Sequence, residues 1–230
     1  AWQFIENTTR SNTATETAKM SEAEQVQYTE ADGIATVTLN RPAALNAMTM
    51  ELMSGITTAF IRVAENDRVR VVVLTGAGRG FCAGADLSQA VRRLAENKPT
   101  AAEPGEDRGE IEDTYNGALR AVMDCPVPTI ARINGAAAGG GFGLALACDI
   151  ALAAQSAFFV ATFGPKLGIV PDMGATWSIP LRVGRARALG ITLLGDRITA
   201  AQALEWGLIW NAVPDEQLDG EVKRIALVLK

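Results

Sequence analysis

Histidine is absent from this chain of 230 residues. Its absence excludes Ser-His-Asp and Cys-His catalytic machinery, and it excludes metal sites built on imidazole ligands. Cysteine is scarce, because Cys82, Cys125 and Cys148 lie far apart and form no CxxC pair. This spacing argues against a thiolate zinc site and fits reduced thiols, so we expect a cytoplasmic protein. Acid–base chemistry must therefore come from carboxylates, lysine, tyrosine, cysteine or backbone donors.

The chain also lacks a cluster of basic residues and an apolar run of membrane-spanning length. The formal net charge is -5 and the chain has no basic block, which argues against a nucleic-acid partner. No apolar run reaches the roughly 18 residues of a membrane span, and the N-terminus lacks the layout of a signal peptide. We therefore expect no nucleic acid and no membrane partner. The hydrophobic content of 48% is still enough for one substantial core.

The stretch from Gly135 to Ile150 is the most distinctive part of the chain. Apolar runs typical of buried strands flank it, and three glycines, Gly139 to Gly141, stand at the start of a small-residue helix. A helix start leaves N–H groups unpaired and carries a positive partial charge. The glycines therefore suit a phosphate, an oxyanion that forms during a reaction, or merely close helix–strand packing. The stretch alone leaves these alternatives open.

The region before this stretch predicts alternating strands and helices. An Asp32-Gly33 turn between two β-branched runs predicts a β-hairpin. Thr49 is placed to cap a helix with an apolar stripe, and a nearly all-apolar strand of the parallel-sheet type follows. This alternation predicts an α/β fold with right-handed crossovers. The expected elements are strands at 26–30, 34–39 and 69–75 and a helix from 49 to about 66.

A second glycine-rich turn, Gly76 to Leu87, follows the last of these strands. Its spacing fits neither a dinucleotide fingerprint nor a Walker loop, although α/β folds place ligand sites at such strand ends. We expect a mobile loop over 97–109, where Pro, Gly, Glu and Asp are mixed, and another loop with Gly and Pro over 164–171. The other expected elements are a strand at 157–160 and helices at 110–124, 175–182, 185–194, 199–206 and from 216 onward.

Three motifs then occur in order: N-R-P-x-x-x-N-A (40–47), F-C-A-G-A-D-L (81–87) and N-G-x-x-x-G-G-G (134–141). Together they resemble the enoyl-CoA hydratase/isomerase family, the crotonase superfamily, over about residues 25–229. The resemblance implies an α/β, ClpP-like spiral of ββα units with C-terminal helices. It also implies an acyl-CoA thioester substrate and a homotrimer or dimer of trimers. No cofactor is implied, because CoA arrives as part of the substrate.

The resemblance also implies an oxyanion hole made of two backbone N–H groups. By motif match these belong to Ala85, the third residue of A-G-A-D, and to Gly140, the middle glycine of the trio. Two such donors hold the thioester oxygen as an enolate forms. Arg41 and Asp86 also fit simpler roles, as a solvated charge and as a helix cap. The CoA-binding residues that the resemblance implies are Arg41, Ala43, Ala83, Gly84, Asp86 and Leu87.

The chain departs from the hydratase pattern of the family at two positions. Gly143 stands where hydratases carry a glutamate after the glycine trio, and Gly164 stands at the position of the second glutamate. The segment 159–166 is one residue longer than usual, and a shift of one residue still brings no carboxylate into place. Adding water requires one group to activate it and a second to protonate the α-carbon, so these departures oppose hydration.

Asp172, in G-I-V-P-D-M-G, is the carboxylate that appears instead. This segment resembles the PaaG-like isomerases of phenylacetate catabolism, in which the aspartate is the catalytic base. One carboxylate over the acyl chain can take a proton from C2 and return one to C4, and an apolar pocket raises its pKa. The alternative role is a Pro-Asp turn that caps the next helix. The resemblance favours the base.

We therefore expect an acyl-CoA isomerase that shifts a Δ3 double bond to Δ2 or rearranges an aryl-epoxide or oxepin CoA thioester. Two alternatives stay open: an enoyl-CoA hydratase of β-oxidation, and a CoA-thioester binding subunit with little catalysis. We expect residues 1–24 to form a mobile tail and residues 25–230 to form one crotonase-fold domain. Family members have further helices beyond the point where Lys230 ends this chain, so we also expect a truncated fold.

Overall fold

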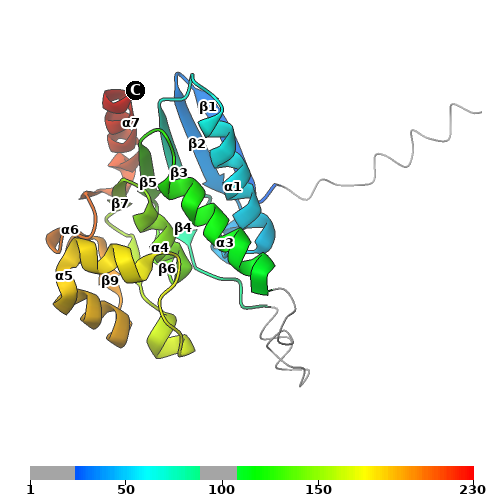
Figure 1. The fold of residues 1–230 in the computed structure, drawn as a ribbon. Helices are drawn as coiled ribbons and strands as arrows, with labels where there is room; N and C mark the ends of the chain where they lie inside the picture. The colour runs from blue at the N-terminus through cyan, green and yellow to red at the C-terminus, as the bar shows by residue number, and fades with distance from the viewer. Residues whose placement is uncertain (1–23, 89–107) are drawn as a thin grey trace, which may run out of the picture.

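The computed structural model describes residues 24–88 and 108–230. The expected tail, apart from Glu24, and the expected loop over 97–109, apart from its last two residues, lie outside these ranges. The described residues form two sheets flanked by helices (Figure 1). The strand order is β1-β2-β3-β5-β7-β10 in the larger sheet and β4-β6-β8-β9 in the smaller one. The α/β fold is as predicted.

The larger sheet begins with the predicted hairpin. Asp32 and Gly33 have φ values of 51° and 78°, and positive φ at both central residues is what a tight type I′ hairpin turn requires. Every residue of the third strand is buried, as expected for a strand covered on both faces. The first pair is antiparallel and the rest are parallel: β1 (Val26–Ala31), β2 (Ile34–Leu39), β3 (Val71–Gly76), β5 (Thr129–Ile133), β7 (Ile150–Ala154) and β10 (Asn211–Val213).

Helices cover both faces of this sheet. α1 (Met50–Ala64) packs on the hairpin strands, α3 (Arg108–Met123) lies beside α1, and α7 (Leu218–Leu229) packs on β3, β5 and β7 (Figure 1). Thr49 caps α1 as predicted, because its Oγ1 accepts a hydrogen bond from Leu52 N at 3.1 Å. Within the two described ranges, no helix has the length and apolarity that a membrane crossing needs.

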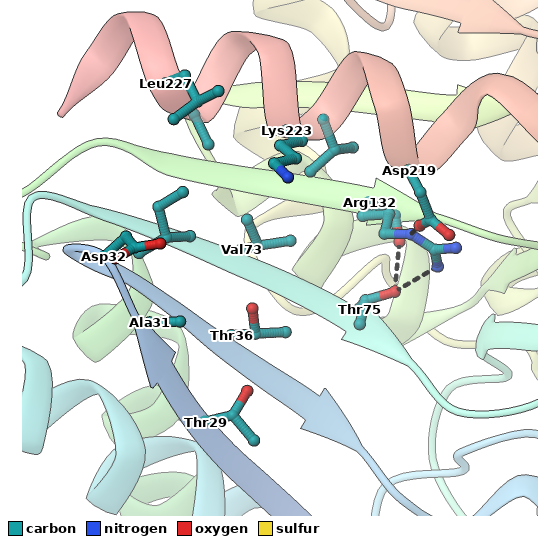
Figure 2. A pocket seen from close by; sticks show the side chains of 13 residues that line it. Thr29, Ala31, Asp32, Thr36, Val73, Thr75, Arg132, Asp219, Lys223 and Leu227 are labelled. Atoms are coloured by element: carbon teal, nitrogen blue, oxygen red, sulfur yellow. Dashed lines mark hydrogen bonds and ion pairs between the residues drawn. The ribbon is translucent and has the colours of Figure 1, made fainter.

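A cavity of about 500 Å³ lies between α7 and the strands β1 to β3 (Figure 2). Thr36 and Val73 line it from the sheet, and Leu227 lines it from α7. Arg132 lies at one end of the cavity, where it donates hydrogen bonds to Asp219 Oδ1 at 2.6 Å and to Thr75 Oγ1 at 3.1 Å (Figure 2). None of the predicted site residues, all of which are described, lines this cavity.

The smaller sheet positions the two glycine-rich turns. Its strand β6 was not predicted, because three alanines between glycines carry no β-branched signal. α4 (Gly140–Ala147) begins within the glycine trio, as predicted. The parallel strands are β4 (Gly80–Cys82), β6 (Ala136–Ala138) and β8 (Phe158–Val160), and β9 (Ile198–Thr199) is antiparallel to β8.

The segment after β8 corrects one prediction. A π-helical turn, Phe163–Leu167, occupies the first part of the loop expected over 164–171, and residues 168–171 are irregular as predicted. A π turn holds one more residue than an α turn, and it overlaps the segment 159–166 in which the sequence shows an extra residue. α5 (Ala175–Leu194) follows, and its break at Gly184, with φ 75°, separates the two predicted helices. α6 (Ala200–Glu205) completes the order before β10 and α7.

Candidate active site

The carboxyl ends of β4 and β6 bring the two glycine-rich turns together. Because the strands pair in parallel, the chain leaves both at the same edge of the small sheet, where α/β folds place ligand sites. Gly84 has φ 90°, and a Cβ there would lie 2.8 Å from Ala138 O and 3.2 Å from Gly140 N. The turn before Ala85 therefore touches the start of α4, and only glycine permits this approach.

The backbone N–H of Ala85 points away from the segment beside it. Met48 N donates to Gly84 O at 2.8 Å, and Asp86 N donates to Met48 O at 2.9 Å. Successive N–H groups of an extended chain point in opposite directions, so the Ala85 N–H faces the other side. No hydrogen bond between described residues uses it, and the residue is exposed.

The backbone N–H of Gly140 is a second donor at the same edge. Gly140 is the first residue of α4, after the N-cap Gly139 with φ 51°. An N–H at this position has no partner within its own helix, and in the described part of the chain no other group accepts from it. The partial positive charge of the helix start adds to its preference for a negative oxygen.

Asp172 lies beside the same glycine. A Cβ at Gly140 would lie 3.5 Å from Asp172 Oδ1, and 3.1 Å from both Met48 Sδ and Met173 Cγ. Surrounding protein atoms raise the pKa of the Asp172 carboxyl above its ordinary value, because they remove water from the charged form. Solvent still reaches this side chain in the single chain. The structure thus brings together the carboxylate and both donors that the sequence singled out.

Gly143, the position of the first hydratase glutamate, has no room for a side chain. A Cβ there would lie 2.3 Å from Met173 O and 2.7 Å from Met173 Cβ. Such distances are far below the contact distance of carbon with carbon or oxygen. The backbone that carries Asp172 therefore fills the space in which a glutamate at this position would begin. Gly164, at the second glutamate position, lies in the π turn, and a Cβ there would lie 3.3 Å from Thr192 O of α5.

Tyr115 of α3 was not predicted as a site residue. Its phenol OH donates to Met48 O at 3.2 Å. Burial raises the pKa of Tyr115, and the negative charge of Asp172 raises it further. One turn later on the same helix face, Leu119 approaches Gly174. The i, i+4 spacing of these two large side chains was the signal that could have found this face.

A cavity of about 300 Å³ adjoins the segment that carries Asp172. Met173 lines it together with Leu119 of α3, Leu146 of α4 and Trp177 of α5. The charged side chains of Asp149 and Arg182 also line it, whereas the Asp172 carboxylate and the two N–H donors do not.

The predicted CoA-binding residues lie on two neighbouring segments, 41–48 and 83–87. The Arg41 guanidinium joins these segments, because it donates to Asp86 Oδ2 at 2.8 Å and to the Ala47 carbonyl. Asp86 Oδ1 accepts from Ser88 N at 3.0 Å, as a helix cap would. The hydrogen bonds from Ser88, and then the Arg41 guanidinium, hold the pKa of Asp86 below its ordinary value.

The remaining residues of these segments include exposed Ala43 and Leu87 and half-buried Ala83. Contact of the two segments with CoA stays a prediction. Fully buried Asn46 fixes their geometry, since its Nδ2 donates to Gly80 O at 2.9 Å and its Oδ1 accepts from Arg41 N at 2.8 Å. Over residues 24–88 and 108–230, no group of three or more Cys, Asp or Glu side chains is arranged to hold a metal ion.

The chain forms a spiral of sheets and helices, and the two short parallel strands β4 and β6 lead to N–H groups that have no partner among the described residues. This arrangement is a crotonase-type fold. A family model for enoyl-CoA hydratase/isomerase matches residues 29–229. The chain is 45% identical over 195 residues to the 1,2-epoxyphenylacetyl-CoA isomerase of Escherichia coli (strain K12), covering 84% of this chain and 71% of that protein. It is 41% identical over 190 residues to a probable enoyl-CoA hydratase of Rhodobacter capsulatus, covering 83% and 69%.

Solved structures of enoyl-CoA hydratases resemble the fold of this chain. The crystal structure of an enoyl-CoA hydratase from Mycobacterium avium subsp. paratuberculosis K-10 matches with a TM-score of 0.76 at 36% identity, covering 89% of this chain and 74% of that one. The chain belongs to the enoyl-CoA hydratase/isomerase family. Its trimeric assembly and its cytoplasmic location stay predictions.

Proposed function

We propose that the chain is an acyl-CoA isomerase in which Asp172 transfers the proton and the N–H groups of Ala85 and Gly140 hold the thioester oxygen. The observation that carries this proposal is the place of the Asp172 carboxylate, whose Oδ1 lies 3.5 Å from the position that a Cβ at Gly140 would occupy. In an acyl thioester, C2 is bonded directly to the carbonyl carbon. A base that removes the C2 proton must therefore lie next to the donors that bind the carbonyl oxygen.

The proposed reaction needs one base and no other proton carrier. The Asp172 carboxylate takes a proton from C2 of a 3-enoyl-CoA, and the electron pair of that C–H bond moves onto the thioester oxygen, which becomes an enolate. The N–H groups of Ala85 and Gly140 stabilise this charge, and removal of one oxyanion-hole donor typically costs about 10²–10³ in kcat. Asp172 returns the proton at C4, and the double bond ends between C2 and C3.

The position of Gly143 supports isomerisation over hydration. Hydration needs a second acid–base group on the other reacting carbon, and the space for a side chain at Gly143 is occupied by Met173. The similarity to a 1,2-epoxyphenylacetyl-CoA isomerase supports the same choice and extends it to ring-containing CoA thioesters. The similarity to a protein named a probable enoyl-CoA hydratase makes hydration the second candidate.

Product analysis with 3-hexenoyl-CoA in D₂O tests the proposal. We expect 2-hexenoyl-CoA, with deuterium entering only at C2 or C4, and no 3-hydroxyacyl-CoA as an early product. Liquid chromatography against standards separates the two isomers, NMR locates the deuterium, and mass spectrometry detects the added water of a 3-hydroxyacyl-CoA. Early 3-hydroxyacyl-CoA would favour the hydratase. If the linear substrate binds without conversion, 1,2-epoxyphenylacetyl-CoA is the next substrate, and binding of both without conversion would favour the non-catalytic subunit.

The pH dependence of kcat/KM should report the raised pKa of Asp172. The base must be ionised, so kcat/KM should rise with pH as Asp172 loses its proton. Because burial raises this pKa, the rise should lie above the ordinary carboxyl range of about 4. Steady-state rates of 3-hexenoyl-CoA conversion from pH 4 to 9 measure the curve. A profile that is flat down to pH 4 would contradict the assignment.

A further inference from the structure

Arg41 stands at the start of a line of hydrogen bonds that ends at the Ala85 N–H. Its guanidinium Nη1 donates to the Ala47 carbonyl. The N–H of the same peptide group, that of Met48, donates to Gly84 O at 2.8 Å. The Gly84 carbonyl in turn shares its peptide group with the Ala85 N–H. Two peptide groups, aligned head to tail, thus connect a cation with the proposed oxyanion donor.

Hydrogen bonds in such a line strengthen one another. A cation at a carbonyl oxygen draws electron density toward that oxygen, and the N–H of the same peptide group becomes a better donor. This polarisation adds about 10–30% per bond in condensed-phase estimates. The first bond is the strongest kind, since hydrogen bonds with an ionised partner are roughly twice as strong as neutral ones.

The surroundings fix the line and shield it from water. The other terminal nitrogen of Arg41, Nη2, donates to Asp86 Oδ2 at 2.8 Å, which holds Nη1 against the Ala47 carbonyl. The Arg41 and Asp86 side chains are only 22% and 18% exposed. Met48 is 1% exposed and Gly84 is buried. Low exposure weakens screening, so the guanidinium acts through the peptide groups more strongly than it would at an open surface.

We infer that Arg41 is a positioning residue that orients and polarises the Ala85 N–H toward the thioester oxygen of the acyl-CoA. The inference rests on the proposed function, because it needs Ala85 as an oxyanion donor. It differs from the expected role of Arg41 as a CoA-binding residue, which for a guanidinium means a ligand of the CoA phosphates. A phosphate ligand acts on binding and therefore on KM, whereas this line of bonds acts on the developing charge and therefore on kcat.

Absorption of a bound chromophoric thioester tests the inference directly. The probe is 4-(dimethylamino)cinnamoyl-CoA, whose absorption band moves to longer wavelength when its thioester carbonyl is polarised. The proteins are the wild type, Arg41→Gln, which keeps a neutral N–H donor, and Arg41→Lys, which keeps the cation. Arg224→Met is the control, because Arg224 forms an exposed ion pair with Glu221 on α7. The kcat and KM for 3-hexenoyl-CoA are measured alongside.

We expect a red shift with the wild type and with Arg224→Met, and a smaller shift with Arg41→Gln. The kcat of Arg41→Gln should fall about tenfold, less than the loss of a whole oxyanion donor, with little change in KM. Arg41→Lys should recover part of both effects. The band of the bound probe is obtained from the difference spectrum against free probe, so partial misfolding of a variant lowers the amplitude of this band and leaves its wavelength unchanged.

The two possible failures are distinct. If the wild type does not bind the probe, or binds it without a red shift, the proposed oxyanion hole is wrong, and the inference about Arg41 falls with it. If the wild type shows the shift and Arg41→Gln shows the same shift, Arg41 does not polarise the donor, even if kcat falls. A rise in KM at unchanged kcat and unchanged band position would return Arg41 to the role of a phosphate ligand.

Discussion

Asp172→Asn should lower kcat for 3-hexenoyl-CoA isomerisation by about 10³-fold, within the 10²–10⁴ range typical of a positioned general base. The amide keeps the shape of the side chain but cannot take the C2 proton. KM should change little, because the oxyanion donors are untouched. Steady-state kinetics and the rate of C2–H exchange in D₂O measure the loss, and both should fall together.

The same substitution should leave the fold as stable as before or make it more stable. Burial raises the pKa of Asp172 in the folded chain, so folding disfavours the charged form. This penalty is absent below the ordinary carboxyl pKa, grows as pH rises from the ordinary pKa to the raised pKa of the folded chain, and is complete above the latter. Asparagine carries no charge and removes it. Thermal unfolding at pH 7.5 should therefore show an equal or higher Tm, which separates lost chemistry from lost structure.

Asp215→Asn is the matched control for this prediction. Asp215 accepts a hydrogen bond from Ser156 N at 3.0 Å, which holds its pKa below the ordinary value. Its charged form thus favours folding above the ordinary carboxyl pKa, opposite in sign to Asp172. We expect unchanged kcat and an equal or lower Tm. Full activity of Asp172→Asn would overturn the assignment of the base.

Local signals predicted the elements whose structure depends on near neighbours. The Asp32-Gly33 turn and the Thr49 cap are examples, because both follow from the residues that adopt the special backbone or supply the capping oxygen. β6 and the π turn at Phe163–Leu167 were missed for the opposite reason. Alanine has little strand preference, and Gly and Pro in 164–171 favoured a loop, so pairing with β4 and β8 and contacts with α5 determined these elements.

The residues of the candidate site likewise fall into those that local sequence predicts and those that only tertiary contacts place. The glycine motifs pointed to Ala85 and Gly140 because such motifs describe local backbone. The approach of Asp172 to Gly140 depends on how the segment after β8 folds back, and no local pattern contains that information. The contact of Tyr115 with Met48 O and the hydrogen bond from Met48 N to Gly84 O likewise join segments far apart in the chain. Their bond directions appear only in three dimensions.

Gly143→Ala should destabilise the chain and reduce activity together. The new Cβ would lie 2.3 Å from Met173 O, so α4 or the segment with Asp172 must move. Overpacking of this kind costs about 1–3 kcal/mol or more, and each kcal/mol lowers Tm by about 2–4 °C in a domain of this size. Displacement of Asp172 by about 1 Å is enough to lower kcat about 10²-fold. Thermal unfolding and isomerase kinetics measure the two effects.

Gly190→Ala controls for the intrinsic effect of adding a methyl group to a helical glycine. Gly190 lies in α5, and a Cβ there meets no atom within 4 Å. Alanine favours a helix over glycine by about 1 kcal/mol, so this variant should be equally or more stable and fully active. The contrast isolates the contact with Met173. If Gly143→Ala were as stable and active as Gly190→Ala, the space beside α4 would be open. A carboxylate could then be accommodated at position 143, and the structural argument against hydration would fail. If the contrast holds, Gly143→Glu cannot restore the hydratase pattern, because the backbone that positions Asp172 occupies the place of the missing acid.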